Sequence, residues 1–220
     1  MIAIFEGKGA RWQGEIEGQP ITASDILQGG LDPISIFIMP GGRDRPYHLA
    51  LKGDANAQLR TFVEQGGTYL GICAGAYYGC ATVDFERGHP LEVYESRELC
   101  FFKGSAVGPV YGKGIFDYRS EKGARLAKIG TEVGTFDVYY KGGCTFEGDL
   151  SHVKILARYL DLPNQPPAII ECKVGKGKAI LSGVHIEKQP ALMPYVLELC
   201  RQSDESEDEK LSVPHQDRCL

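Results

Sequence analysis

The chain of 220 residues has no cysteine pair at Cys-x-x-Cys spacing, and its seven cysteines are an odd number. The cysteines are scattered along the sequence: Cys73, Cys80, Cys100, Cys144, Cys172, Cys200 and Cys219. This spacing argues against a disulfide framework and against a structural zinc site. We therefore expect reduced thiols and no bound metal, and no pattern in the sequence indicates a cofactor.

The sequence also lacks an apolar run long enough to span a bilayer and a basic-then-apolar N-terminus typical of a signal peptide. We therefore expect a cytoplasmic protein with no membrane partner. Basic residues are not in excess: the formal net charge is −5, of which residues 203–220 contribute −4. The nearly neutral remainder indicates no nucleic-acid surface, and residues 203–220 are expected to form an acidic, disordered tail.

What remains is typical of a globular protein, with 43% hydrophobic and 24% charged residues. A chain of this length can bury a sizeable core in one unit. We expect a single α/β domain over residues 1–202.

The stretch that organises the sequence runs from Thr68 to Tyr78. An apolar β-type run is followed by the small-residue turn Gly-Ile-Cys-Ala-Gly at residues 71–75 and then by residues that can form a helix. A nucleophile elbow has this layout, because its tight strand-to-helix turn needs small neighbours. A helix beginning at Ala74 would favour the Cys73 thiolate, the attacking species, through its dipole and free N–H groups. The alternative is that Cys73 is a buried small hydrophobic residue beside glycines needed only for packing.

The first half of the chain alternates strand and helix patterns. Apolar runs at residues 1–5, 35–39 and 68–72 predict strands. Between them, Thr22 and Asp25 have capping-box spacing, and residues 54–65 carry apolar side chains at helical spacing. Because each helix joins two strands, the sequence predicts an α/β fold with a doubly wound, mostly parallel sheet.

The second half changes to short apolar runs separated by glycines, at residues 91–94, 99–102, 136–140 and 153–157. They predict a mostly antiparallel β region beside the main sheet or extending it. The runs at 168–174 and 178–182 flank Gly-Lys-Gly, which favours a hairpin over a phosphate loop because no helix follows. Pro190 suits the first position of a last helix.

A cysteine nucleophile needs a base, and the base needs a group that orients it. His185 follows the last predicted strand and has Glu187 two residues on, so the carboxylate can reach the imidazole. The alternative is a histidine that serves only the structure at a strand end. The other histidines have no comparable neighbours: His48, His89, His152 and His215.

Two adjacent glycines follow the strand at residues 35–39. Gly41 and Gly42 let backbone N–H groups turn inward, and with the N–H of Ala74 they could hold the oxyanion of a tetrahedral intermediate. The alternative is an ordinary turn after a strand. Next to them, Arg43 suggests a substrate that bears a carboxylate, because a guanidinium binds this group bidentately, unless Arg43 is only a surface loop residue.

Three blocks together resemble the class I glutamine amidotransferase superfamily. They are residues 38–44 (Ile-Met-Pro-Gly-Gly-Arg-Asp), 71–78 (Gly-Ile-Cys-Ala-Gly-Ala-Tyr-Tyr) and 177–185 (Gly-Lys-Ala-Ile-Leu-Ser-Gly-Val-His), with Glu187 beyond. More narrowly, they resemble the amidotransferase-like domain at the N-terminus of eukaryotic-type biotin protein ligases. The resemblance implies a flavodoxin-like fold from the first strand to about Leu199.

The resemblance also implies roles: Cys73 attacks an amide or ester carbonyl, His185 moves the proton and Glu187 orients His185. It further implies oxyanion donors at Gly41, Gly42 and Ala74. Members that use glutamine usually have Gln four residues after the nucleophile, where this chain has Tyr77, so glutamine as the substrate stays open.

No Gly-Arg-Gly-Arg stretch occurs, and little sequence follows Leu199. We therefore expect no biotinylation by this chain alone. An amidotransferase role would need a partner, a separate synthetase or ligase protein.

Three functions are consistent with these patterns. The first is a cysteine hydrolase or acyl-transfer enzyme for a small amide or ester, with a pocket formed by Arg43, Asp44, Tyr77 and Tyr78. The second is a catalytically silent module that binds a small molecule or regulates a partner. The third is the related peptidase and deglycase group, in which a different acid usually serves the cysteine.

Overall fold

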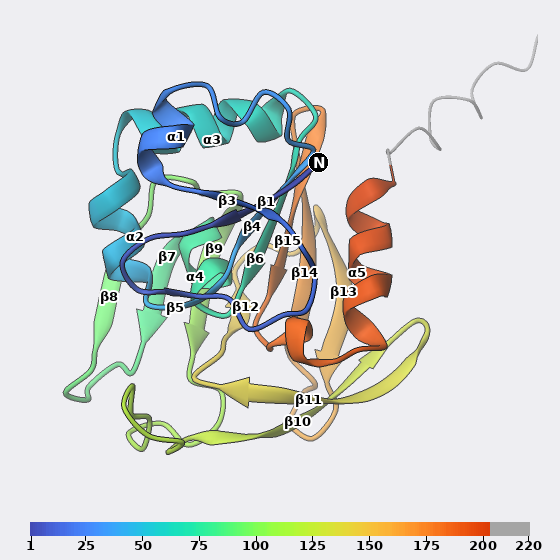
Figure 1. The fold of residues 1–220 in the computed structure, drawn as a ribbon. Coiled ribbons are helices and arrows are strands. Elements are labelled where there is room, and N and C mark those ends of the chain that lie inside the picture. Colours follow the sequence, from blue (N-terminus) through green and yellow to red (C-terminus); the bar gives the residue numbers. More distant parts are fainter. Residues whose placement is uncertain (203–220) are drawn as a thin grey trace, which may run out of the picture.

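The computed structural model describes residues 1–202, so the expected tail at 203–220 lies outside the described residues. The centre of the fold is a nine-stranded sheet in the order β11-β10-β13-β14-β15-β6-β4-β1-β3 (Figure 1). Its parallel half consists of β3 (Gln19–Ile21), β1 (Ile2–Phe5), β4 (Ile36–Met39), β6 (Thr68–Ile72) and β15 (Gly177–Ser182). Its antiparallel half consists of β14 (Pro167–Val174), β13 (Val153–Tyr159), β10 (Ala124–Thr131) and β11 (Gly134–Lys141).

Two smaller sheets accompany the main sheet. A four-stranded sheet has the order β12-β9-β7-β8 and is built from Thr145–Glu147, Phe102–Gly108, Cys80–Phe85 and Val93–Ser96, respectively. A two-stranded sheet pairs β2 (Ala10–Arg11) with β5 (Gly41–Gly42). The region predicted as mostly antiparallel therefore both extends the main sheet and forms a separate sheet beside it, in which the central pair, β7 and β9, is parallel.

Helices cover both faces of the main sheet. In Figure 1, α1 (Ala23–Leu27), α2 (Asp44–Leu51) and α3 (Asp54–Glu64) lie on one side, and α5 (Leu192–Arg201) lies on the other. The remaining helical elements are α4 (Ala74–Gly79) and the short 3-10 turn η1 (Ile186–Lys188). Among residues 1–202, none of the helices combines the length and apolar character needed to cross a membrane.

Alternating side chains on the parallel strands create two cores. On β4, Phe37 and Met39 belong to the core under α1 and α3, whereas Ile36 and Ile38 belong to the core under α5. Strands buried on both faces have continuous apolar sequences, because each alternate residue meets a different layer. This burial explains why the apolar runs of the first half could be recognised as strands.

The hairpin at Gly175–Gly177 is present, since β14 and β15 pair antiparallel across it. Two predictions were wrong in detail. The last helix begins at Leu192 with Ala191 as its N-cap, so Pro190 lies before the helix and not at its first position. Residues 99–101 precede β9 and are not part of a strand, since Cys100 has a φ of 46°.

The parallel strands bring three distant segments to one edge. In the register of the sheet, Met39 of β4 lies opposite Gly71 of β6, and Ile72 lies opposite Ser182 of β15. The residues that follow these strand ends are therefore neighbours in space, although they are far apart in the sequence.

Candidate active site

Cys73 occupies a sharp turn between β6 and α4. Its φ of 50° and ψ of −106° lie in a region that side-chain-bearing residues rarely adopt. The turn is anchored from the neighbouring strand, because the Cys73 N–H donates to the Ser182 carbonyl at 2.8 Å. Backbone strain at one residue, held by surrounding structure, is typical of functional sites.

The turn depends on the small residues that flank Cys73. A Cβ atom on Gly75 would lie 2.1 Å from the Met39 carbonyl oxygen, and one on Gly71 would lie 2.5 Å from the Gly75 carbonyl oxygen. Both contacts are with backbone, which cannot turn aside as a side chain can. The Gly-Ile-Cys-Ala-Gly pattern is therefore required by the close approach of α4 to β4 and β6.

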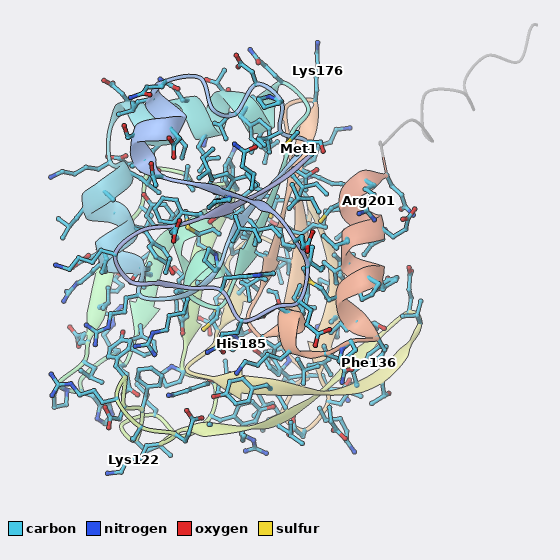
Figure 2. All side chains as sticks on the ribbon, in the orientation of Figure 1. Met1, Lys122, Phe136, Lys176, His185 and Arg201 are labelled. Carbon is cyan, nitrogen blue, oxygen red and sulfur yellow. The ribbon has the colours of Figure 1, made fainter. Side chains whose placement is uncertain are left out.

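His185 and Glu187 are joined by a short hydrogen bond. Nδ1 of His185 lies 2.6 Å from Oε1 of Glu187, whose side chain is only 1% exposed. The His185 N–H donates to the Tyr139 carbonyl at 3.0 Å, and η1 turns Glu187 back toward the ring. In Figure 2, His185 lies at the end of the sheet opposite to Lys176, which is in the turn that precedes β15.

The other side of the imidazole faces Cys73. Burial lowers the pKa of His185, but the charge of the Cys73 thiolate, a hydrogen bond to it and the Glu187 carboxylate together raise it to about 10. Cys73 Sγ also lies 3.6 Å from the Lys141 carbonyl oxygen. The three side chains predicted to act together therefore follow one another in space in the order thiol, imidazole, carboxylate. The imidazole is held in its charged form.

Gly41 lies against both reacting groups. A Cβ atom there would lie 2.7 Å from Cε1 of His185 and 3.7 Å from Cβ of Cys73. A larger residue would therefore displace the imidazole, so glycine at this position keeps the thiol and the ring in contact.

Two backbone N–H groups near Cys73 are suited to bind an anion. The N–H of Ala74 lies in the first turn of α4, where no intrahelical carbonyl can accept it. The second N–H is that of Gly42 in β5.

The pairing of β5 with β2 gives the direction of the Gly42 N–H. The register places Arg11 opposite Gly41, and the backbone N–H of Arg43 donates to the Gly9 carbonyl at 3.1 Å. Because hydrogen-bonded pairs alternate in an antiparallel ladder, the Gly41 N–H faces β2, whereas the Gly42 N–H points away from it.

Two cavities meet at Cys73. The inner one, of about 30 Å³, is lined by Gly42, Asp44, Cys73, Ala74, Tyr77, Val83, Phe85, Phe116, Tyr118, Lys141 and Gly142. The outer one, of about 110 Å³, is lined by Arg11, Gln13, Gly41, Gly42, Arg43, Cys73, Phe116, Tyr118, Glu121, Tyr139, Lys141, His185 and Lys188. We call them the inner pocket and the vestibule.

The segment between β9 and β10 supplies part of both cavities. Lys141 Nζ donates to the Ser120 carbonyl at 2.5 Å, and the Tyr139 hydroxyl donates to Glu121 at 2.7 Å. The Gly114 N–H donates to the buried Glu86 carboxylate at 2.7 Å. These bonds hold Phe116 and Tyr118 over Cys73, since both rings line both cavities.

Asp44, which lines the inner pocket, forms an ion pair with the buried residue Arg97. Nε and Nη2 of Arg97 donate to Oδ2 of Asp44 at 2.8 and 2.5 Å, and the Arg97 side chain is 1% exposed. Burial raises the pKa of the Asp44 carboxyl, and the charge of Arg97 opposes the increase. Arg97 also donates to Glu95 at 2.9 Å.

The four residues predicted to form one pocket do not all lie in the same cavity. Tyr77 and Asp44 line the inner pocket, and Arg43 lines the vestibule with its guanidinium 4.1 Å from the centroid of the Tyr118 ring. Tyr78 lies outside both cavities: it is fully buried, and its hydroxyl donates to Asn56 at 2.9 Å. Tyr78 packs the α4 turn against its surroundings.

Several lining residues were not found from the sequence, namely Arg11, Phe85, Phe116, Tyr118, Tyr139, Lys141 and Lys188, and neither was Arg97, the partner of Asp44. They come from β2, the four-stranded sheet and its end, the segment before β10 and the ends of β11 and η1. No local motif marks them. The signal that did exist was the unusual share of tyrosine and phenylalanine between residues 85 and 140.

The fold is shared with structures already solved. A crystal structure of a glutamine amidotransferase superposes with a TM-score of 0.62 at 23% sequence identity, covering 84% of this chain and 87% of that one. The chain therefore shares the α/β fold of that glutamine amidotransferase, with a mostly parallel core and added antiparallel strands, and this is the fold class that the sequence predicted.

Sequence comparison then gives the family. The model of the family described as biotin-protein ligase, N terminal, matches residues 27–219, and the chain belongs to this family. An uncharacterized protein of Chlamydia muridarum is 43% identical over 159 residues, which are 70% of this chain and 61% of that protein. A biotin–protein ligase of Schizosaccharomyces pombe is 40% identical over 182 residues, 78% of this chain but 27% of the ligase. The chain thus spans less than two thirds of the length of either relative.

Proposed function

We propose that this protein is an acyl-transfer enzyme or hydrolase that uses Cys73 as its nucleophile and acts on a small amide or ester. The observation that carries the proposal is that one imidazole, that of His185, is hydrogen-bonded to Glu187 and lies beside Cys73, with which it lines one cavity across Gly41. A thiolate beside an imidazolium is the reactive state of a cysteine nucleophile, and an oriented base completes it.

In the proposed reaction, Cys73 Sγ attacks the carbonyl carbon and the carbonyl oxygen becomes an oxyanion. The N–H groups of Gly42 and Ala74 are the proposed donors to this oxyanion. Gly41, predicted as a third donor, instead provides room, because its N–H faces β2. His185 then gives its proton to the leaving nitrogen or oxygen, and the bond from carbon to the leaving group breaks.

The second half of the reaction releases the enzyme. His185, now neutral, takes a proton from water, and the hydroxide attacks the thioester carbon. The C–S bond breaks, Cys73 leaves as a thiolate and the acid product departs. Glu187 holds the Nδ1 proton throughout and stabilises the imidazolium each time it forms.

The substrate is proposed as a small amide or ester rather than as glutamine in particular. Tyr77 stands four residues after Cys73, and its hydroxyl donates to the Gly142 carbonyl at 3.2 Å. It therefore occupies the wall of the inner pocket and leaves little room there. The name of the fission yeast relative suggests a separate ligase or synthetase protein as a partner for any transfer reaction.

Alkylation across pH tests the nucleophile directly. We expect iodoacetamide to modify Cys73 near neutral pH faster than it modifies a model thiol, with the rate at each cysteine followed by peptide mass spectrometry. Cys100, which is half-buried and outside both cavities, is the internal reference. His185→Gln should slow the reaction at Cys73, whereas Cys100→Ala should leave it unchanged. Reactivity at Cys73 no greater than that of the model thiol would refute the proposal.

A catalytically silent binding module is the second candidate, favoured by Tyr77 and by the small volume of the inner pocket. It requires no turnover over a panel of amides and esters, together with binding of one small molecule that Cys73→Ala does not weaken.

The variant Glu187→Gln tests the third possibility, an enzyme of the peptidase and deglycase group. Activity left intact in this variant would indicate the arrangement of the peptidase and deglycase group, in which another acid serves the cysteine.

A further inference from the structure

We propose that the substrate combines a short uncharged acyl group with a leaving group that carries a negatively charged oxyanion group, either a carboxylate or a phosphate. The inference rests on the proposed function and goes beyond it by assigning each half of the substrate to one cavity. The acyl group occupies the inner pocket, and the leaving group occupies the vestibule.

The position of His185 fixes this orientation. Cys73 lines both cavities, so the carbonyl carbon under attack lies where they meet. His185 lines the vestibule and not the inner pocket. Because a general acid must be within hydrogen-bond reach of the atom it protonates, the leaving atom lies on the vestibule side. The acyl substituent is then left on the inner side.

Cationic side chains dominate the vestibule. Four of them line it, Arg11, Arg43, Lys141 and Lys188, against the single carboxylate of Glu121. This balance contrasts with the formal net charge of −5 for the whole chain. A concave site of one sign concentrates ligands of the opposite sign, so the vestibule favours an anionic group.

Three of these cations are available to a ligand. Within residues 1–202, no carboxylate lies within 4.0 Å of the charged nitrogens of Arg11, Arg43 or Lys188. Aromatic faces hold two of them instead: the Arg43 guanidinium lies over Tyr118, and Lys188 Nζ lies 3.9 Å from the centroid of the Tyr139 ring. These rings orient the charges without neutralising them.

The inner pocket has the opposite character. Its walls are mostly the side chains of Val83, Phe85, Phe116 and Tyr118, and its volume of about 30 Å³ fits a group of one or two carbons. An anionic acyl group would lie beside the negatively charged Asp44 carboxylate. Arg97 would not attract this group, because its charge is already paired with Asp44. Lys141 does not offset this, since its Nζ is engaged with Ser120 and lies 3.5 Å from Glu121.

The reaction balances without another reactant besides water. The Sγ–carbon bond forms and the bond from carbon to the leaving oxygen or nitrogen breaks, with the proton coming from His185. The anionic alcohol or amine departs through the vestibule. Water then cleaves the thioester and releases a short carboxylic acid.

Three matched esters test the orientation. Phenyl acetate is neutral, 4-acetoxybenzoate carries a carboxylate on the leaving group, and monophenyl succinate carries it on the acyl group. After correction for the uncatalysed hydrolysis of each ester in the same buffer, which for monophenyl succinate includes attack by its own carboxylate, we expect kcat/KM for 4-acetoxybenzoate to exceed that for phenyl acetate by about tenfold or more. Monophenyl succinate should be the poorest of the three. Equal corrected values, or a preference for monophenyl succinate, would overturn the inference.

Variants locate the preference. Arg43→Gln combined with Lys188→Gln should lower the ratio between 4-acetoxybenzoate and phenyl acetate, with only Arg11 of the three available cations remaining, and raised salt should reduce the ratio in the unmodified protein. Lys122→Gln is the matched control, because Lys122 is exposed in the same segment as Tyr118 but lines neither cavity. A ratio that is unchanged in the double variant would overturn the assignment to the vestibule.

Alkylation distinguishes the failure of this inference from that of the proposed function. Iodoacetate is anionic and iodoacetamide is neutral, so their rate ratio at Cys73 reports the local potential without any turnover. A ratio above that of glutathione supports the inference. A highly reactive Cys73 with the ratio of glutathione would overturn the inference alone, and an unreactive Cys73 would overturn both. Protection of Cys73 by benzoate or by inorganic phosphate would identify which oxyanion the vestibule prefers.

Discussion

At the residue scale, His185 is the group on which the site depends. It is buried between a thiol and a carboxylate, and these two partners outweigh the cost of burying a charge. The imidazolium is therefore stable in the folded protein well above the pH at which an unfolded chain would lose the proton.

This difference predicts the direction of a pH effect on stability. The pKa of His185 is about 10 in the folded protein, against an ordinary value of 6.5. A raised pKa stabilises the fold fully below about pH 6.5, and the contribution is lost as the pH rises toward 10. Chemical denaturation should therefore show the free energy of unfolding falling more steeply over this range in the unmodified protein than in His185→Gln.

Two variants check the cause. Cys73→Ser removes the sulfur and should reduce the slope, since Cys73 is a main cause of the raised pKa of His185. His152→Gln should behave like the unmodified protein, because His152 is exposed. Parallel curves for the unmodified protein and His185→Gln would contradict the role assigned to the imidazolium.

The sequence could indicate Cys73, His185, Glu187, Gly42 and Ala74, because each follows a strand end that its own local pattern marks. It could not indicate the vestibule. Arg11 reaches the site only because β2 pairs with β5, and Lys188 does so because η1 folds back on β11. Tyr78 was misplaced because adjacent helical residues point in different directions, and only Tyr77 faces the cavity.

At the element scale, the geometry of α4 depends on Gly75. Alanine is favoured over glycine in a helix by about 1 kcal/mol, yet here its Cβ would lie 2.1 Å from the Met39 carbonyl oxygen. We expect Gly75→Ala to destabilise the protein by about 1–3 kcal/mol, because β4 or α4 must shift. The accelerated alkylation of Cys73 should be lost as well.

Gly134→Ala is the matched control for this change. Gly134 has a φ of 141° and open space around its Cβ position, so its substitution carries a backbone cost without a clash. We expect a loss of about 1–2 kcal/mol and no change at Cys73. A Gly75→Ala protein that kept its stability and its reactive thiol would show that α4 is not held by this contact.

Elements with strong local signals were predictable. The capping box at Thr22 is formed, and α3 ends at Glu64 before the two glycines. Elements with weak local signals were not predictable. The strand β3 is three residues long and includes Pro20, and α2 includes Pro46 in its first turn, so neither had a clear pattern. The strand β3 exists because its pairing with β1 compensates for poor local propensity, whereas Pro46 is tolerated in the first turn of α2, where its missing N–H costs no hydrogen bond.

At the scale of the whole molecule, the ion pair of Asp44 with Arg97 joins α2 to the edge of the four-stranded sheet. Both side chains are buried, so removing one leaves the other charge without its partner. We expect Arg97→Met to destabilise the protein by about 3–5 kcal/mol. Adding Asp44→Leu should recover part of this loss, and a double-mutant cycle measured by denaturation would quantify the coupling.

Arg45→Met provides the comparison, because Arg45 pairs with Glu95 through side chains that are 54% and 37% exposed. An exposed pair contributes less than about 1 kcal/mol. Similar losses for the Arg97 and Arg45 variants would mean that the buried pair does not join α2 to the four-stranded sheet.

The strand β15 lies between β6 and β14, parallel to one and antiparallel to the other. A chain severed at Lys176, in the turn before it, would leave the thiol on one fragment and the imidazole with its carboxylate on the other. The smaller fragment could regain its place only by inserting a strand into the middle of the larger one. Mixed fragments would therefore become reactive toward a thiol reagent only on reassembly, which makes this fold a natural scaffold for a split reporter.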